Sequence, residues 1–81
     1  MTAKARALTL RQLEIFTAAA QQGSFTRAAG ELLLSEAAVS QQIKLLETVV
    51  GAQLFERIPR RPIRLTDAGW VLLQTCDSLF Q

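Results

Sequence analysis

Arginine is concentrated in one short segment of this chain. Residues 57–64 contain two prolines, no acidic residue and four arginines: Arg57, Arg60, Arg61 and Arg64. Residues 1–56 hold five cations and five anions, so the formal net charge of +2 originates in this segment. Guanidinium groups match phosphate oxygens, and a local excess of them is expected where a protein meets a polyanion. The pattern predicts a phosphate-binding segment, with a solvated basic loop as the alternative.

The segment just before the arginines is an amphipathic helix over about residues 36–50. Its apolar residues recur at helical spacing and are predicted to face the core: Val39, Ile43, Leu46 and Val50. A different arc carries short or polar side chains: Glu36, Ala37, Ser40, Gln41, Lys44, Glu47 and Thr48. Gln41 can pair with adenine, Lys44 can reach guanine or a phosphate, and Ser40 can bond several bases. This arc indicates a helix that reads base-pair edges, or a set of ordinary solvent-facing residues.

The start of this helix offers two further polar groups. Ser35 can cap the helix and also bond a phosphate, because the free N–H groups of a helix N-terminus favour an anion. Glu36 is repelled by phosphates, yet its carboxylate can accept a hydrogen bond from cytosine N4 or favour the helix N-terminus through its charge.

Several classes of chemistry are excluded by the residue types present. The chain has no histidine and a single cysteine, Cys76, so it can form neither an internal disulfide nor a Cys/His metal cluster nor a Ser-His-Asp site. We therefore expect no enzyme and no cofactor. No apolar run is long enough to span a membrane, and the composition suits a reduced, cytoplasmic protein. A protein-interaction domain whose basic segment meets an acidic partner is the alternative from another class.

Capping signals divide the 81 residues into short helices. Thr9 and Gln12 form a capping box that starts a helix at Leu10, with Leu8 able to staple onto Leu13. Gly23 is predicted to end this helix, and Gly51 to end the third. Ser24 and Ser35 are predicted to cap the second and third helices, which a tight link joins as in a helix-turn-helix.

A small wing and a last helix complete the predicted order α-α-α-β-β-α. Leu54–Ile58 and Ile63–Leu65 are predicted strands, and the prolines between them belong in the connecting loop. Arg60 and Arg61 at the tip can enter a narrow minor groove. Arg57 and Arg64 suit phosphate, although Arg57 can equally stack on or pair with its own domain. Thr66 is predicted to cap the last helix.

The last helix has two apolar arcs, one of which would remain in water in a monomer. The first contains Ala68, Val71, Leu72 and Leu79, and the second contains Trp70, Leu73, Cys76 and Phe80. We expect one arc to cover the core and the second to pair with another copy, the alternative being a helix buried on both sides in a larger protein. A two-fold dimer must read an inverted repeat.

Many fixed spacings together resemble one family. The matching residues are Thr26-Arg27-Ala28-Ala29, Leu32, Ser35, Ala38-Val39-Ser40, Gln42-Ile43, Leu46-Glu47, Gly51, Leu54-Phe55-Glu56-Arg57 and Leu65-Thr66-Asp67-Ala68-Gly69. Over about residues 8–80 they resemble the N-terminal DNA-binding domain of LysR-type transcriptional regulators. The chain departs from the family pattern in two places: Glu36-Ala37 replaces a common Gln-Pro, and Trp70 replaces a common histidine or other polar residue.

The resemblance implies a mainly α, winged helix-turn-helix domain over residues 8–65 and a linker or dimerisation helix over 66–81. It implies that Glu36, Ala37, Ser40 and Gln41 face the major groove of double-stranded DNA. It further implies that Thr26 and Ser35 contact phosphate and that Arg61 lies at the wing tip. A homodimer through the last helix, a tetramer of the full-length regulator and an inducer bound in a separate effector domain are also implied.

Overall fold

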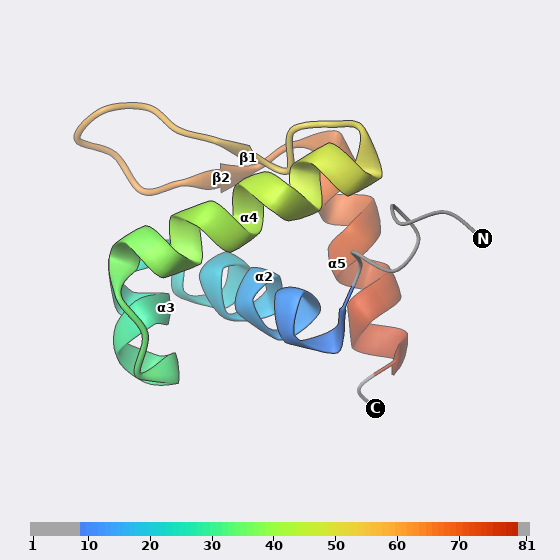
Figure 1. Cartoon of the computed structure of the whole chain (residues 1–81). Helices are drawn as coiled ribbons and strands as arrows, with labels where there is room; N and C mark the ends of the chain where they lie inside the picture. The colour runs from blue at the N-terminus through green and yellow to red at the C-terminus, as the bar shows by residue number, and fades with distance from the viewer. Residues whose placement is uncertain (1–8, 80–81) are drawn as a thin grey trace.

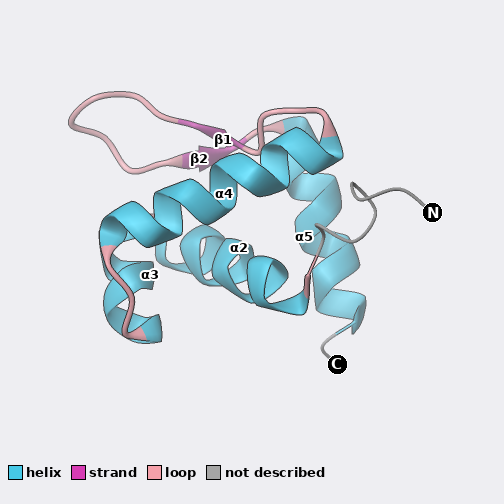
Figure 2. Ribbon diagram, in the orientation of Figure 1, coloured by secondary structure: helices cyan, strands magenta, loops and turns pink. Residues whose placement is uncertain are grey.

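The protein, described by a computed structural model over residues 9–79, has four helices and one small sheet in the predicted order (Figure 1). The elements are α2 (Leu10–Gln22), α3 (Phe25–Leu32), α4 (Glu36–Val50), β1 (Phe55–Glu56), β2 (Arg64–Leu65) and α5 (Asp67–Leu79). The first three helices pack on one another, α5 packs against α2, and the two strands form a hairpin beside α4 (Figure 2). This mainly helical winged arrangement confirms the predicted fold class. Among the described residues, no helix is both long enough and apolar enough to cross a membrane.

Short-range hydrogen bonds explain why the helices begin where they do. Thr9 and Gln12 form both bonds of the capping box, at 3.1 and 3.2 Å. The hydroxyls of Ser24, Ser35 and Thr66 each accept a hydrogen bond from the backbone N–H three residues further on. These bonds satisfy N–H groups that have no partner within the helix, and they confirm the four predicted helix starts. The predicted staple residue Leu8 lies outside the described residues.

Two glycines end helices in the left-handed conformation. Gly23 has φ 65° after α2, and Gly51 has φ 85° after α4, as predicted. The turn between α3 and α4 uses Leu33 instead, with φ 59° and 92% of its surface exposed. A left-handed leucine is strained relative to glycine, so the compact turn is maintained by the helices on either side of it.

The core is built around aromatic rings from three elements. The Phe55 ring on β1 lies 5.4 Å from that of Phe16 and 5.5 Å, edge to face, from that of Phe25. From α4, Val39, Ile43 and Leu46 are fully buried against them. Val50 lies on the same arc, but the prediction that it faces the core was wrong. It is the last residue of the helix and is 42% exposed, because the buried stripe ends one turn earlier at Leu46.

The strands of the wing are shorter than predicted. Each has two residues, and Phe55 pairs with Leu65 and Glu56 with Arg64 in antiparallel register. At one end, the N–H of Leu54 donates to the Glu47 side chain at 2.8 Å and not to a neighbouring strand. At the other end, the N–H of Arg61 donates to the Ile58 carbonyl at 3.1 Å, so the chain already turns there. Most of segment 57–63 is therefore loop.

The assignment of the two arcs of α5 requires correction. Cys76, placed by sequence on the dimerisation arc, is fully buried in the core of its own domain, and Leu73 is partly buried against the same core. Burial raises the pKa of the Cys76 thiol, an effect that a hydrogen bond with the Thr17 side chain opposes. Val71, placed on the other arc, is 65% exposed. Trp70 is 55% exposed, as expected for the open face, while Phe80 lies outside the described residues.

Candidate nucleic-acid interface

The predicted base-reading positions lie together on one exposed face of α4. Glu36, Ala37, Gln41 and Lys44 are exposed, and Ser40 is half-buried. They lie on the side of the helix away from the buried residues Val39, Ile43 and Leu46. Capping by Ser35, whose Oγ accepts from the Ala38 N–H at 3.0 Å, fixes the start of this face. The face is thus preformed without a partner.

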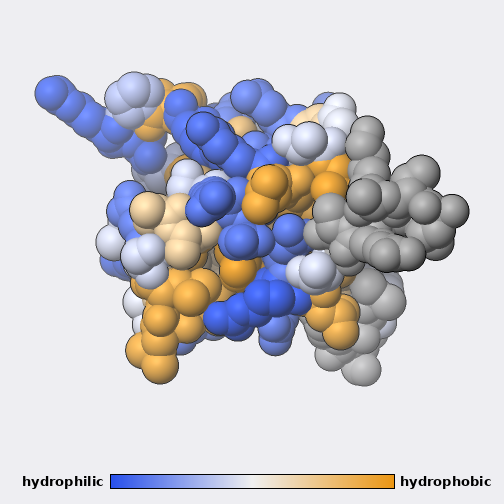
Figure 3. All heavy atoms as spheres, in the orientation of Figure 1, coloured by the Kyte–Doolittle hydropathy of each residue, from blue (hydrophilic) through white to orange (hydrophobic). Residues whose placement is uncertain are grey.

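The wing lies alongside α4, and its loop projects beyond the first turns of that helix (Figure 1). The N–H of Ile63 donates to the Gly23 carbonyl at 3.3 Å, which ties the returning half of the loop to the turn between α2 and α3. Arg60, Arg61 and Arg64 are exposed and form no ion pair with any other described residue. In the space-filling view a hydrophilic arm projects from the molecule, with hydrophobic surface beside its base (Figure 3). Its guanidinium groups are free to meet an anion.

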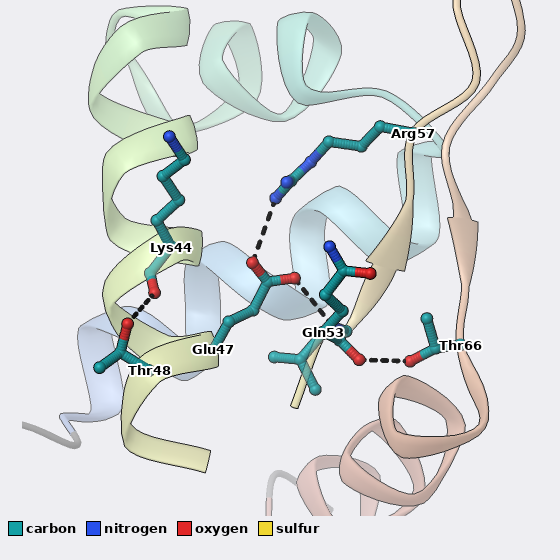
Figure 4. Close-up of polar contacts among 7 residues, drawn as sticks. Lys44, Glu47, Thr48, Gln53, Arg57 and Thr66 are labelled. Carbon is teal, nitrogen blue, oxygen red and sulfur yellow. Dashed lines mark hydrogen bonds and ion pairs between the residues drawn. The ribbon is translucent and has the colours of Figure 1, made fainter. Parts of the chain in front are cut away.

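Arg57 differs from the other wing arginines because its own domain already holds it. Its guanidinium carbon lies 5.1 Å from the centre of the Phe25 ring. Its Nη2 lies 3.5 Å from Oε1 of Glu47, as Figure 4 shows. The side chain remains 35% exposed. The sequence left open whether Arg57 binds phosphate or stacks on and pairs with its own domain. The structure shows the stacking on Phe25 and the pairing with Glu47.

Glu47 is a structural residue, although sequence placed it on the base-reading arc. Its side chain is only 11% exposed, and its two oxygens are used separately. Oε2 accepts from the backbone N–H of Leu54 at 2.8 Å, and Oε1 faces Arg57 (Figure 4). A carboxylate that bonds a backbone N–H in the interior makes a strong, charge-assisted bond. Glu47 therefore joins the end of α4 to the start of the wing.

Thr26 and Glu36 contact each other across the helix-turn-helix. The Thr26 hydroxyl, in the first turn of α3, donates to Oε2 of Glu36, in the first turn of α4, at 2.6 Å. Both residues are exposed. Sequence reasoning treated them as two independent contacts, and the ten residues that separate them give no signal of this pairing.

A shallow groove of about 280 Å³ brings these groups together between the starts of α3 and α4 and the wing. Its lining residues are Gly23, Ser24, Phe25, Thr26, Glu36, Arg57, Arg61, Pro62 and Ile63. Polar side chains of the helix-turn-helix, the Glu36 carboxylate and the guanidinium groups of Arg57 and Arg61 thus line one groove.

The geometry defines a winged helix-turn-helix, and comparison with known proteins identifies its family. A model of the bacterial regulatory helix-turn-helix proteins of the lysR family matches residues 10–70. The chain therefore belongs to the LysR family, and it corresponds to the DNA-binding domain of a LysR-type transcriptional regulator.

Similar proteins agree with this placement. The chain is 53% identical over 79 residues to the HTH-type transcriptional regulator CfxR of Cupriavidus necator, covering 98% of the chain and 25% of that protein. It is 46% identical over 71 residues to the HTH-type transcriptional activator CmpR of Synechocystis sp., covering 88% of the chain and 23% of that protein. The chain thus spans about a quarter of the length of these relatives. Their names describe regulators, in agreement with the prediction of a non-enzyme.

Solved structures show the same fold bound to DNA. A complex of the BenM DNA-binding domain with catB site 1 DNA matches with a TM-score of 0.85 and 37% identity, covering 90% of this chain and 81% of that one. The complex of the CbnR DNA-binding domain with DNA matches with a TM-score of 0.85 and 34% identity, covering 90% of this chain and 83% of that one.

Proposed function

We propose that this domain recognises a specific sequence of double-stranded DNA by inserting the exposed face of α4 into the major groove. The observation that carries the proposal is the position of the free wing arginines next to that face. A helix in the major groove brings the adjoining wing to the sugar-phosphate backbone and the neighbouring minor groove. The DNA complexes of the BenM and CbnR domains support DNA binding by this fold.

The side chains divide into two roles. Gln41 and Ser40 read base edges, Lys44 reaches guanine or a phosphate, and Ala37 allows close approach. Ser35 and the arginines Arg60, Arg61 and Arg64 hold the backbone, and Arg61 at the wing carries most of the minor-groove contact. Arg57 contributes positive charge from its stacked position. Its phosphate contact is secondary to its structural one, because Glu47 and Phe25 already fix its direction.

A homodimer through residues 66–81 would present two copies of α4 to the DNA. Trp70 and Val71 support this proposal, since both large apolar side chains are exposed on the outer side of α5. A two-fold axis between the copies makes the preferred site an inverted repeat, with half-sites about one helical turn or more apart. Leu73 and Cys76 would act indirectly, by packing α5 onto its own domain.

A complete regulator of this kind would add an effector domain that binds a small-molecule inducer and assembles tetramers. We expect such a protein to act in the cytoplasm, where bacterial DNA is found. Residues 8–65 would then form the DNA-binding domain, and residues 66–81 would link it to the remainder.

Selection of bound sequences from random duplex DNA tests the function directly. We expect an enriched inverted repeat, bound at least about 1,000-fold more tightly than bulk DNA. The control is a variant with Gln41→Ala and Lys44→Ala, two exposed positions whose replacement leaves the core intact. Enrichment of no sequence by the unaltered chain would contradict the proposal and favour the protein-interaction alternative.

A further inference from the structure

The contact between Thr26 and Glu36 assigns these residues a joint role. We propose that Glu36 determines base preference and that Thr26 is the positioning residue that orients its carboxylate, not a phosphate contact. This inference rests on the proposed function, since it concerns the same DNA-reading surface. It replaces the phosphate role that family resemblance implies for Thr26.

The chemistry of the hydroxyl supports this assignment. An ionised carboxylate only accepts hydrogen bonds, so the 2.6 Å contact uses the single proton of the Thr26 hydroxyl. A DNA phosphate is also only an acceptor, so Thr26 cannot donate to it while it donates to Glu36. The carboxylate would in addition repel a phosphate placed at this point. A phosphate contact therefore requires the loss of a short, charge-assisted bond.

The same bond fixes the direction of the Glu36 side chain. A free glutamate at the first position of a helix samples several rotamers, and ordering it on binding costs conformational entropy. Held through Oε2, the carboxylate leaves Oε1 without a hydrogen bond to any other described residue. Its position in the first turn of α4 also lets the helix N-terminus stabilise the charge.

The Glu36 carboxylate, held in one direction and able only to accept hydrogen bonds, discriminates between bases on the base-reading face. Cytosine presents its N4 amino group as a donor in the major groove, whereas guanine presents two acceptors there. The carboxylate thus favours cytosine and disfavours guanine and nearby phosphates. Arg61 in the shared groove offsets part of the negative charge without pairing to it.

Three variants of the 81-residue chain, each profiled by selection from random duplexes, test the assignment. Thr26→Val keeps the shape and removes the hydroxyl, Thr26→Ser keeps the hydroxyl, and Glu36→Gln removes the charge. We expect Glu36→Gln to abolish a cytosine preference at one position of each half-site and to raise affinity for bulk DNA. Thr26→Val should weaken the same preference by roughly threefold to tenfold and leave other positions unchanged. Thr26→Ser should retain the original profile.

A double-mutant cycle separates positioning from phosphate binding. In the Glu36→Gln background, Thr26→Val should have little further effect on the base profile, because the group it orients has lost its charge. An even loss of affinity across all sequences would show instead that Thr26 holds a phosphate. The salt dependence should stay unchanged in that case, because the Thr26 hydroxyl carries no charge that releases counterions. An unchanged profile in Thr26→Val would also overturn the inference. If the unaltered chain selects no sequence, the proposed function itself fails, which is a different outcome. Circular dichroism and thermal melting confirm that each variant is folded.

Discussion

At the scale of single residues, Gly69 is the glycine with the least space for a side chain. It lies in the first turn of α5, where an added Cβ would meet the Leu54 carbonyl oxygen and lie 2.8 Å from Cδ2 of Leu65. No flexible side chain alone can relieve this contact, because Leu54 presents its backbone. The glycine therefore permits α5 to approach the start of the wing.

We predict that Gly69→Ala lowers the free energy of unfolding by about 1–3 kcal/mol, as overpacking does elsewhere. Gly30→Ala is the matched control, because Gly30 lies within α3 and an added Cβ there meets nothing within 4 Å. The control should raise stability by about 0.5–1 kcal/mol through the higher helix propensity of alanine. Urea denaturation of both variants measures the difference. Equal effects of the two substitutions would contradict the close packing of α5.

Residue-scale features were the most accessible to sequence analysis. The caps at Thr9, Ser24, Ser35 and Thr66 were predicted correctly because donor and acceptor are three residues apart. Contacts over longer separations were not predicted. Gln12 was assigned only to its capping box, yet it is buried and its Nε2 donates to Gln42 at 3.3 Å. No local pattern reveals which distant side chain will meet it.

At the scale of elements, Glu47 is the main polar link between α4 and the wing. The Leu54 side chain is fully buried, so the N–H of Leu54 depends on the Glu47 carboxylate for its hydrogen bond. Two further bonds, from the Thr66 hydroxyl to the Gln53 carbonyl at 2.6 Å and from the Thr66 N–H to the Leu54 carbonyl at 3.0 Å, attach the returning strand and α5. The direction of the wing is set at this junction.

We predict that Glu47→Ala costs about 1–3 kcal/mol of stability, because it leaves a buried N–H without a partner. Glu47→Gln keeps an acceptor oxygen and should cost less. Arg57→Ala serves as a second control and should cost less than about 1 kcal/mol, since its ion pair with Glu47 is long and partly exposed. Guanidinium denaturation monitored by circular dichroism measures the free energy of unfolding of each variant and so checks the predicted order of the three losses. A larger loss for Arg57→Ala than for Glu47→Ala would show that the ion pair, and not the backbone bond, holds the junction.

Helical periodicity predicted the elements better than their orientation. On α4 one apolar stripe left little choice, and Val39, Ile43 and Leu46 are buried as expected. On α5 two arcs were equally apolar. Helical periodicity alone could not show which of the two arcs meets the core. Cys76 was assigned to the wrong side for this reason. The predicted strands were too long because a bond to the Glu47 side chain at one end and a backbone turn at Arg61 at the other replaced strand pairing. Neither is visible to periodicity.

At the scale of the whole molecule, charge should govern how DNA is held. We predict that Arg61→Ala weakens binding to all duplexes and lowers the salt dependence by about one counterion per half-site, since each neutralised phosphate releases its condensed ions. Arg11→Ala is the control, because it removes the same charge from α2, where Arg11 pairs with Glu14 at 3.7 Å. Fluorescence anisotropy over a range of salt concentrations measures the salt dependence of binding for both variants. An unaltered salt dependence for Arg61→Ala would exclude a phosphate contact by Arg61.

Association of two copies is the second property at this scale. We predict that Trp70→Glu weakens the dimer on the order of 100-fold, because it replaces a large exposed apolar group with a charge that faces its own copy. The fold should persist, since Trp70 is 55% exposed. Gln21→Glu adds the same charge to an exposed position of α2 as a control. Sedimentation equilibrium measures both dissociation constants, and equal constants would place the dimer contact elsewhere.

The separation between the exposed face of α4 and its buried stripe has a consequence for how such regulators diverge. Ala37, Gln41 and Lys44 contribute little to the interior, so changes at these positions can alter operator choice with small effects on folding. Glu36 is different, because its side chain is bonded to Thr26 on another helix. A lineage that acquires a new operator would therefore be free to vary three of these sites singly, whereas the fourth would tend to change together with its neighbour.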